Sequence, residues 1–83
     1  PPKMWKVVFL NDDQTPMELV IELLTKVFKH TETRAKEITM EIHETGSGIA
    51  GVYTYEIAEQ RGIEATNIAR ANGSPLRIQV EQE

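Results

Sequence analysis

A short acidic turn carries the residues of this sequence that are best suited to binding chemistry. Asn11, Asp12 and Asp13 follow an apolar run and precede a strong helix start, which gives short polar side chains a rigid mount. Asn11 and Asp12 supply oxygen acceptors, and a neutral His43 supplies an acceptor at one ring nitrogen. Because an ammonium group has only donors and carries positive charge, these residues suit a ligand with a free amine.

Apolar side chains are expected around this turn. Met17 and Val20 share one face of the helix that follows it. Thr39, Ile42 and His43 share a face of the next helix. Periodicity does not separate the wall of a pocket from a hydrophobic core, so for Met17 and Val20 both interpretations stay open.

Signals of catalysis and metal binding are weak. The sequence contains no glycine-rich phosphate loop and no paired-histidine zinc motif, and it suggests no serine–histidine–aspartate set. The Gly-Ser-Gly run at residues 46–48 is typical of a turn between a helix and a strand. A metal-dependent hydrolase built on His43, Asp12 and Asp13 remains an alternative, although one histidine with scattered carboxylates is a poor ligand set.

Composition limits the class of partner. The chain has 83 residues, with 9 Lys and Arg against 13 Asp and Glu, and a formal net charge of −4. This balance argues against nucleic acid and against an anionic membrane surface, and it mildly suits a positively charged partner. The absence of cysteine excludes disulfides and thiolate zinc sites and fits a reducing cytoplasm. No apolar run approaches the ~18 residues of a membrane span.

The elements are predicted in the order β-α-α-β-α-β, within one domain over residues 1–83. Strands are expected at residues 4–10, 49–53 and 76–80, where β-branched residues or alternation dominate. Thr15, Thr31 and Thr54 are expected to cap three helices, the first through a Thr15–Glu18 capping box and with an end near residues 29–30. This order predicts an α+β sandwich, in which the helices cover one face of a mainly antiparallel three-stranded sheet.

Three segments of the chain resemble the ClpS family of N-end rule adaptors. They are residues 6–18 (KVVFLNDDQTPME), 51–59 (GVYTYEIAE) and 69–76 (ARANGSPL), in the family's order. The resemblance implies an adaptor that is not an enzyme and needs no cofactor. Such an adaptor binds proteins whose first residue is Leu, Phe, Tyr or Trp and delivers them to the ClpAP protease. The family fold, a three-stranded sheet with three helices, agrees with the predicted elements.

The resemblance also assigns roles to particular positions. It implies that Asn11, Asp12 and His43 contact the α-amino group of the cargo. It implies that Glu56 and Arg61 belong to the surface for the N-terminal domain of ClpA. The pocket for the first side chain falls on Phe9, Leu10, Thr15, Met17, Val20, Thr39, Ile42 and Leu76.

Three features depart from the family pattern. Thr39 stands where the family often has methionine, at what looks like a gate to the pocket, which leaves the range of accepted side chains open. The family usually has a flexible N-terminal extension that takes part in delivery, and residues 1–3 are expected to be its remnant. Gly62 stands inside the third helix, where a larger residue is usual and where glycine costs about 1 kcal/mol relative to alanine.

We expect the protein to be a monomer.

A general protein-interaction module is the alternative from another functional class. The C-terminal domain of the ribosomal stalk protein has a similar element order and docks factors on one helical face. It lacks the Asn-Asp-Asp turn with a partnering histidine, so Asp12→Ala would leave a function of that kind intact.

Overall fold

The computed structural model describes residues 1–83 and contains six elements in the predicted order. The strands are β1 (Trp5–Leu10), β2 (Ser47–Tyr53) and β3 (Arg77–Gln82). The helices are α1 (Met17–Lys26), α2 (Glu32–Thr45) and α3 (Tyr55–Ala71). The predicted β-α-α-β-α-β order and the α+β class are therefore confirmed.

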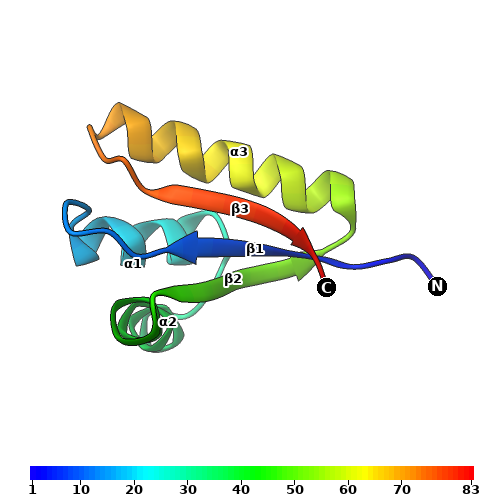
Figure 1. Cartoon of the computed structure of the whole chain (residues 1–83), viewed down its shortest axis with the longest axis horizontal. Coiled ribbons are helices and arrows are strands. Elements are labelled where there is room, and N and C mark those ends of the chain that lie inside the picture. Colours follow the sequence, from blue (N-terminus) through cyan, green and yellow to red (C-terminus); the bar gives the residue numbers. More distant parts are fainter.

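Strand β1 lies at the centre of the sheet, between β2 and β3, and both pairings are antiparallel (Figure 1). The register against β2 shifts between Val7 and Val8, which leaves Ala50 as the extra residue of a β-bulge. Figure 1 shows α3 running along β3, α1 behind the sheet and α2 beside the start of β2.

The hydrophobic core lies between one face of this sheet and all three helices. Val7 and Phe9 of β1 point into it and are fully buried. Ile49 and Val52 of β2 point the other way and are 45% and 37% exposed, so no helix covers that face. The helices contribute Leu19, Val20, Leu23 and Leu24 from α1, Ala35, Ile38 and Ile42 from α2, and Ala58, Ala65 and Ala69 from α3. None of the three helices has the length and apolar character needed to cross a membrane.

The start of α1 differs from the prediction. Pro16, not Thr15, occupies the N-cap position, and no side chain caps the helix. The Thr15 hydroxyl instead bonds to the side chains of Asp12 and Ser74. The capping box that the sequence predicts with Glu18 therefore does not form, because a tertiary partner takes the hydroxyl.

The other helix ends follow local signals more closely. The Thr31 side chain accepts a hydrogen bond from the Arg34 amide at the start of α2, as predicted. Gly46 ends α2 in the left-handed conformation, with φ of 97°, and β2 begins directly after it. Helix α1 ends at Lys26, earlier than expected, and Thr54 holds the N-cap position of α3 without a side-chain hydrogen bond.

Gly62 is buried on the face of α3 that packs on β3. A Cβ atom built at Gly62 would lie 3.4 Å from Val80 Cγ2 and 3.9 Å from Ile78 Cγ2, which are ordinary van der Waals distances. Close packing therefore does not require glycine at this position, and the residue only lowers the helix propensity of α3.

We expect Gly62→Ala to raise the free energy of unfolding by about 1 kcal/mol, because alanine is the better helix former and its methyl group has room. Urea denaturation measures the change. Gly48→Ala is the matched control, since its Cβ would lie 2.7 Å from Ile42 Cγ1 and should destabilise the protein. A less stable Gly62→Ala variant would show that the contact between α3 and β3 is tighter than described.

Candidate functional site

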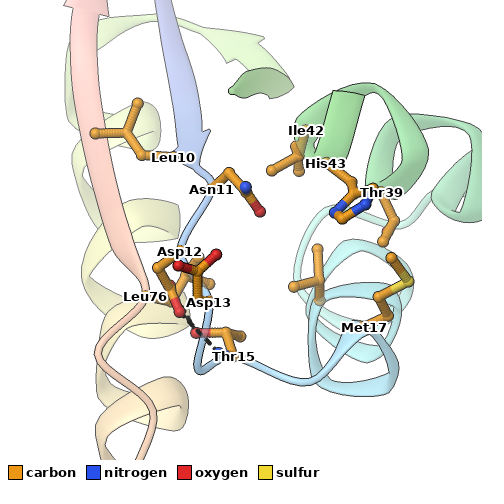
Figure 2. Close-up of a pocket in the computed structure, with 11 residues that line it drawn as sticks. Leu10, Asn11, Asp12, Asp13, Thr15, Met17, Thr39, Ile42, His43 and Leu76 are labelled. Atoms are coloured by element: carbon orange, nitrogen blue, oxygen red, sulfur yellow. Dashed lines mark hydrogen bonds between the residues drawn. The ribbon is translucent and has the colours of Figure 1, made fainter. Parts of the chain in front are cut away.

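A hollow of about 230 Å³ opens where the turn after β1 meets α1, α2 and the segment before β3 (Figure 2). It combines the polar groups of the acidic turn and of His43 with apolar side chains from both helices. The lining residues are Leu10, Asn11, Asp12, Asp13, Thr15, Met17, Val20, Thr39, Ile42, His43 and Leu76.

Asn11 and His43 point toward one another across this hollow (Figure 2). The pairing of β1 with β2 ends at Leu10 and Ser47, and the Asn11 amide then donates to the Gly46 carbonyl at 2.9 Å. This bond holds the acidic turn beside the C-terminal end of α2, whose last turn carries His43. Two acceptors that are distant in sequence are thereby placed on opposite sides of one opening.

Asp12 uses its carboxylate mainly to shape the turn. Its Oδ1 accepts from the backbone N–H groups of Gln14, at 2.8 Å, and Thr15, at 2.7 Å. Its Oδ2 accepts from the Thr15 hydroxyl at 2.8 Å. These bonds fill three of the roughly four acceptor positions of a carboxylate. Asp12 therefore offers a ligand its negative charge more than a free acceptor.

That negative charge persists to low pH. Burial of Asp12 opposes ionisation and is the largest single effect on its pKa. The hydrogen bonds from Thr15 and Gln14, together with the positive charge of Arg70, outweigh it and hold the pKa below the ordinary value of 3.8. At neutral pH the hollow contains a constant negative charge.

Asp13 lines the hollow and is exposed. The sequence indicated a ligand role for Asp13 only in the alternative of a metal-dependent hydrolase. No three His, Asp or Glu side chains of the chain are grouped so that they would hold a metal ion. The geometry therefore gives no support to a metal centre built on His43, Asp12 and Asp13.

The apolar wall of the hollow runs from its rim down to the core. Met17 is 42% exposed at the rim, while Val20, one helical turn further, is only 6% exposed and also belongs to the core. Thr39 is 4% exposed, and its hydroxyl donates to the Ala35 carbonyl at 2.8 Å within α2. Of the two interpretations left open, Met17 therefore belongs only to the wall of the pocket, whereas Val20 belongs to both the wall and the core.

The side chains of Phe9 and Leu10 do not lie where the family resemblance places them, in the pocket. Phe9 is fully buried, packs edge-to-face on Phe28 with ring centroids 5.5 Å apart, and does not line the hollow. Leu10 contributes to the lining, but Figure 2 shows its side chain directed away from Asn11 and the opening. The reason is the alternation of β1, which sends Phe9 into the core and Leu10 to the opposite face.

Glu56 and Arg61 lie on α3 and take no part in the hollow. Glu56 is exposed in the first turn of the helix, and Arg61 is half-buried in its middle. Figure 1 shows that α3 begins at the end of the sheet opposite the turn after β1. A partner that contacts these two residues would leave the hollow open.

Sequence analysis missed two residues that support the site. Ser74 is 4% exposed, its Oγ lies 2.7 Å from Thr15 Oγ1, and it accepts from the Leu76 amide at 3.1 Å. Arg70 Nη1 donates to the carbonyl oxygens of Ser74, at 2.8 Å, and Leu76, at 2.9 Å. Both residues lie in the family-like segment 69–76, but the local signal there was only a Ser-Pro pair, which is typical of any turn.

Comparisons with known proteins agree on one family. Residues 1–79 match the family model described as ATP-dependent Clp protease adaptor protein ClpS. The ClpS adapter of Bdellovibrio bacteriovorus is 44% identical over 82 residues, which cover 99% of this chain and 72% of that protein. The ClpS adapter of Clostridium acetobutylicum is 48% identical over 77 residues, which cover 93% of this chain and 76% of that protein.

A solved structure agrees with the fold over its whole length. The structure of Agrobacterium tumefaciens ClpS2 bound to L-phenylalaninamide matches with a TM-score of 0.96 and 38% sequence identity, and the match covers 100% of both chains. The resemblance drawn from three sequence segments is thereby confirmed. The chain belongs to the ClpS family of ATP-dependent Clp protease adaptor proteins, and it is an adaptor and not an enzyme.

Proposed function

We propose that this protein binds the first residue and the free α-amino group of N-degron substrates and delivers them to the ClpAP protease. The first residues would be Leu, Phe, Tyr and Trp. The observation that carries the proposal is the single hollow in which Asn11, His43 and a charged Asp12 share an opening with an apolar wall. The similar Agrobacterium tumefaciens ClpS2 is bound to L-phenylalaninamide, which has both a free amine and an aromatic side chain.

The polar side of the hollow suits an ammonium group. The Asn11 side-chain oxygen and a His43 ring nitrogen would accept hydrogen bonds from the ammonium, while Asp12 and Asp13 would supply compensating charge. A charge-assisted hydrogen bond contributes about 1.5–3 kcal/mol. An internal peptide amide offers one N–H and no charge. Only the amino terminus of a polypeptide would therefore match the polar side of the hollow.

The apolar side suits the side chain of that first residue. Met17, Val20, Ile42 and Leu76 form the wall, and burial of a large apolar side chain contributes about 1.5–3 kcal/mol. With three bonds to the ammonium, the upper ends of these ranges total about 12 kcal/mol, and the cost of association is at least about 4 kcal/mol. The binding free energy would therefore be no stronger than roughly −8 kcal/mol, a micromolar dissociation constant. Binding of this strength allows the cargo to be released to the protease.

The docking surface for the N-terminal domain of ClpA is proposed to include Glu56 and Arg61. Both residues lie on α3, outside the hollow, so the protein would be able to hold cargo and ClpA at the same time. We propose that the protein acts as a monomer in the cytoplasm. The ribosomal-stalk type of interaction module is set aside, because membership of the ClpS family is shown.

Acetylation of the first amine of a Phe-initiated peptide is expected to abolish binding, because it removes the positive charge and all but one of the donors. Fluorescence anisotropy with matched free and acetylated peptides measures the two affinities. The control is an acetylated lysine further along the same peptide, which should change little. Equal affinity of the free and the amino-terminally acetylated peptides would refute the proposed site.

The affinity for a free-amine peptide is expected to fall above about pH 8, because an α-amino group has a pKa of about 7.7–8.0 and then loses its charge. On the acid side the negative charge of Asp12 is retained, because, despite its burial, its hydrogen bonds hold its pKa below 3.8.

The variant His43→Gln tests the acceptor at this position. Its side-chain oxygen can still accept a hydrogen bond, so the variant should bind the peptide and keep the decrease in affinity above about pH 8. Anisotropy titrations from about pH 7 to pH 9 give both profiles. A wild-type affinity that does not fall above about pH 8 would contradict a contact with a charged amine.

Thr39→Met is expected to change the ranking of first residues. Thr39 is buried in the wall, and a longer side chain there would narrow the hollow while the polar contacts stay in place. Peptides beginning with Trp or Tyr should lose about tenfold in affinity, or about 1.4 kcal/mol, and peptides beginning with Leu much less. Thr25→Met, outside the hollow on α1, is the control. Equal changes for all four peptides would show that Thr39 is not a gate.

A further inference from the structure

A chain of hydrogen bonds joins the start of β3 to the acidic turn. The Leu76 amide donates to Ser74 Oγ at 3.1 Å, and Ser74 Oγ lies 2.7 Å from Thr15 Oγ1. The Thr15 hydroxyl then donates to Asp12 Oδ2 at 2.8 Å. The two hydroxyls stand 59 positions apart in the sequence, and Ser74 is almost completely buried. Water therefore competes little for its hydroxyl.

The ends of this chain determine the direction of every bond in it. The Leu76 amide can only donate, and the ionised Asp12 carboxylate can only accept. Because Thr15 gives its single hydroxyl proton to Asp12, the Ser74 hydroxyl must donate to Thr15. Each hydroxyl thus accepts one bond and donates one in the same sense, and bonds arranged in this way strengthen one another.

The position of the Ser74 hydroxyl is set by α3. The Ser74 amide donates to the Ala69 carbonyl at 2.9 Å. Arg70 Nη1 donates to the carbonyl oxygens on both sides of Pro75, those of Ser74 and Leu76. The backbone on each side of the hydroxyl is therefore held, and the hydroxyl meets the acidic turn at a defined point.

We propose that Ser74 is a positioning residue of the binding hollow: its hydroxyl ties the wall at Leu76 to Thr15 and thereby holds the Asp12 carboxylate at the opening. The inference rests on the proposed function, because it assigns Ser74 a part in binding the ammonium group. Ser74 does not line the hollow and acts only through these neighbours.

Loss of the hydroxyl would have two local effects. The buried Leu76 amide would lose the partner that the structure gives it, and Thr15 would lose its donor. The acidic turn would keep the backbone bond from Asn11 to Gly46 but not its link to β3. The contact with the ammonium depends on this turn, whereas selection among apolar first residues depends mainly on the helices. Loss of the Ser74 hydroxyl should therefore lower the affinity for a free amine without changing the preference among first residues.

The variant Ser74→Ala tests this role with Ser47→Ala as the matched control. Ser47 is the other serine of the chain, lies at the start of β2, and makes no side-chain hydrogen bond. We expect Ser74→Ala to weaken binding of a free-amine Phe peptide by about 5- to 10-fold, the effect of one hydrogen bond. In Ser74→Ala the ratio of the affinities for Phe and Leu peptides should equal that of the wild-type protein. The control Ser47→Ala should bind the Phe peptide with wild-type affinity.

A second readout needs no peptide. An NMR titration of the free protein follows the carboxyl carbon of Asp12 as the pH is changed. The midpoint pH should be higher for Ser74→Ala than for wild type or Ser47→Ala, because the hydrogen bond from the Thr15 hydroxyl to the carboxylate is weakened. Thr15→Val breaks the same chain from its other side and should show both effects. Because both variants break the same chain, adding Ser74→Ala to Thr15→Val should reduce the peptide affinity by a smaller factor than Ser74→Ala does in the wild-type protein.

The outcomes separate this inference from the proposed function. If Ser74→Ala lowers only the melting temperature and leaves both the Asp12 midpoint and the peptide affinity at their wild-type values, Ser74 is structural and the inference is wrong. The same holds if Ser74→Ala does not fold and Thr15→Val binds normally. If the wild-type protein bound no free-amine peptide, the proposed function would fail first, and the positioning role with it.

Discussion

The hydrogen bond from the Asn11 amide to the Gly46 carbonyl is the interaction on which the site depends. It continues the ladder between β1 and β2 by one step beyond the last paired residues. Gly46 accepts it in a left-handed conformation that also ends α2 directly after the turn carrying His43. The conformation of Gly46 therefore ends α2, and the backbone bond to its carbonyl brings the acidic turn opposite the histidine. The hollow is thus built where the turn after β1, the helices α1 and α2 and the segment before β3 meet.

In the proposed function, the groups around the hollow would have separate roles in binding a chain terminus. Asp12 is largely satisfied by its own turn and supplies a negative charge, whereas Asn11 and His43 would accept hydrogen bonds from the ammonium. The helices supply an apolar wall that is continuous with the core. Since the polar side would act through direction and charge and the wall through shape, the amine and the first side chain would be recognised nearly independently.

Local signals in the sequence were enough to predict the elements, whereas most of the pocket lining was predicted from the family resemblance. Thr31 caps α2 through its own side chain and Gly46 ends it, because both effects involve only neighbours in the chain. Thr15 looks like an equally good cap, but its hydroxyl bonds to Ser74, a partner that no local pattern reveals. Phe9 was assigned to the pocket from the family pattern, while the alternation of β1 places it in the core.

The most direct measurement is a crystal structure of the protein with a short peptide that begins with phenylalanine and has a free amine. We expect the peptide's first nitrogen to lie within about 3.2 Å of the Asn11 side-chain oxygen and of a His43 ring nitrogen, with the phenyl ring against Met17 and Ile42. A peptide seated elsewhere, such as the hollow between α3 and β3 beside Ile63, or one whose first nitrogen faces solvent, would contradict this.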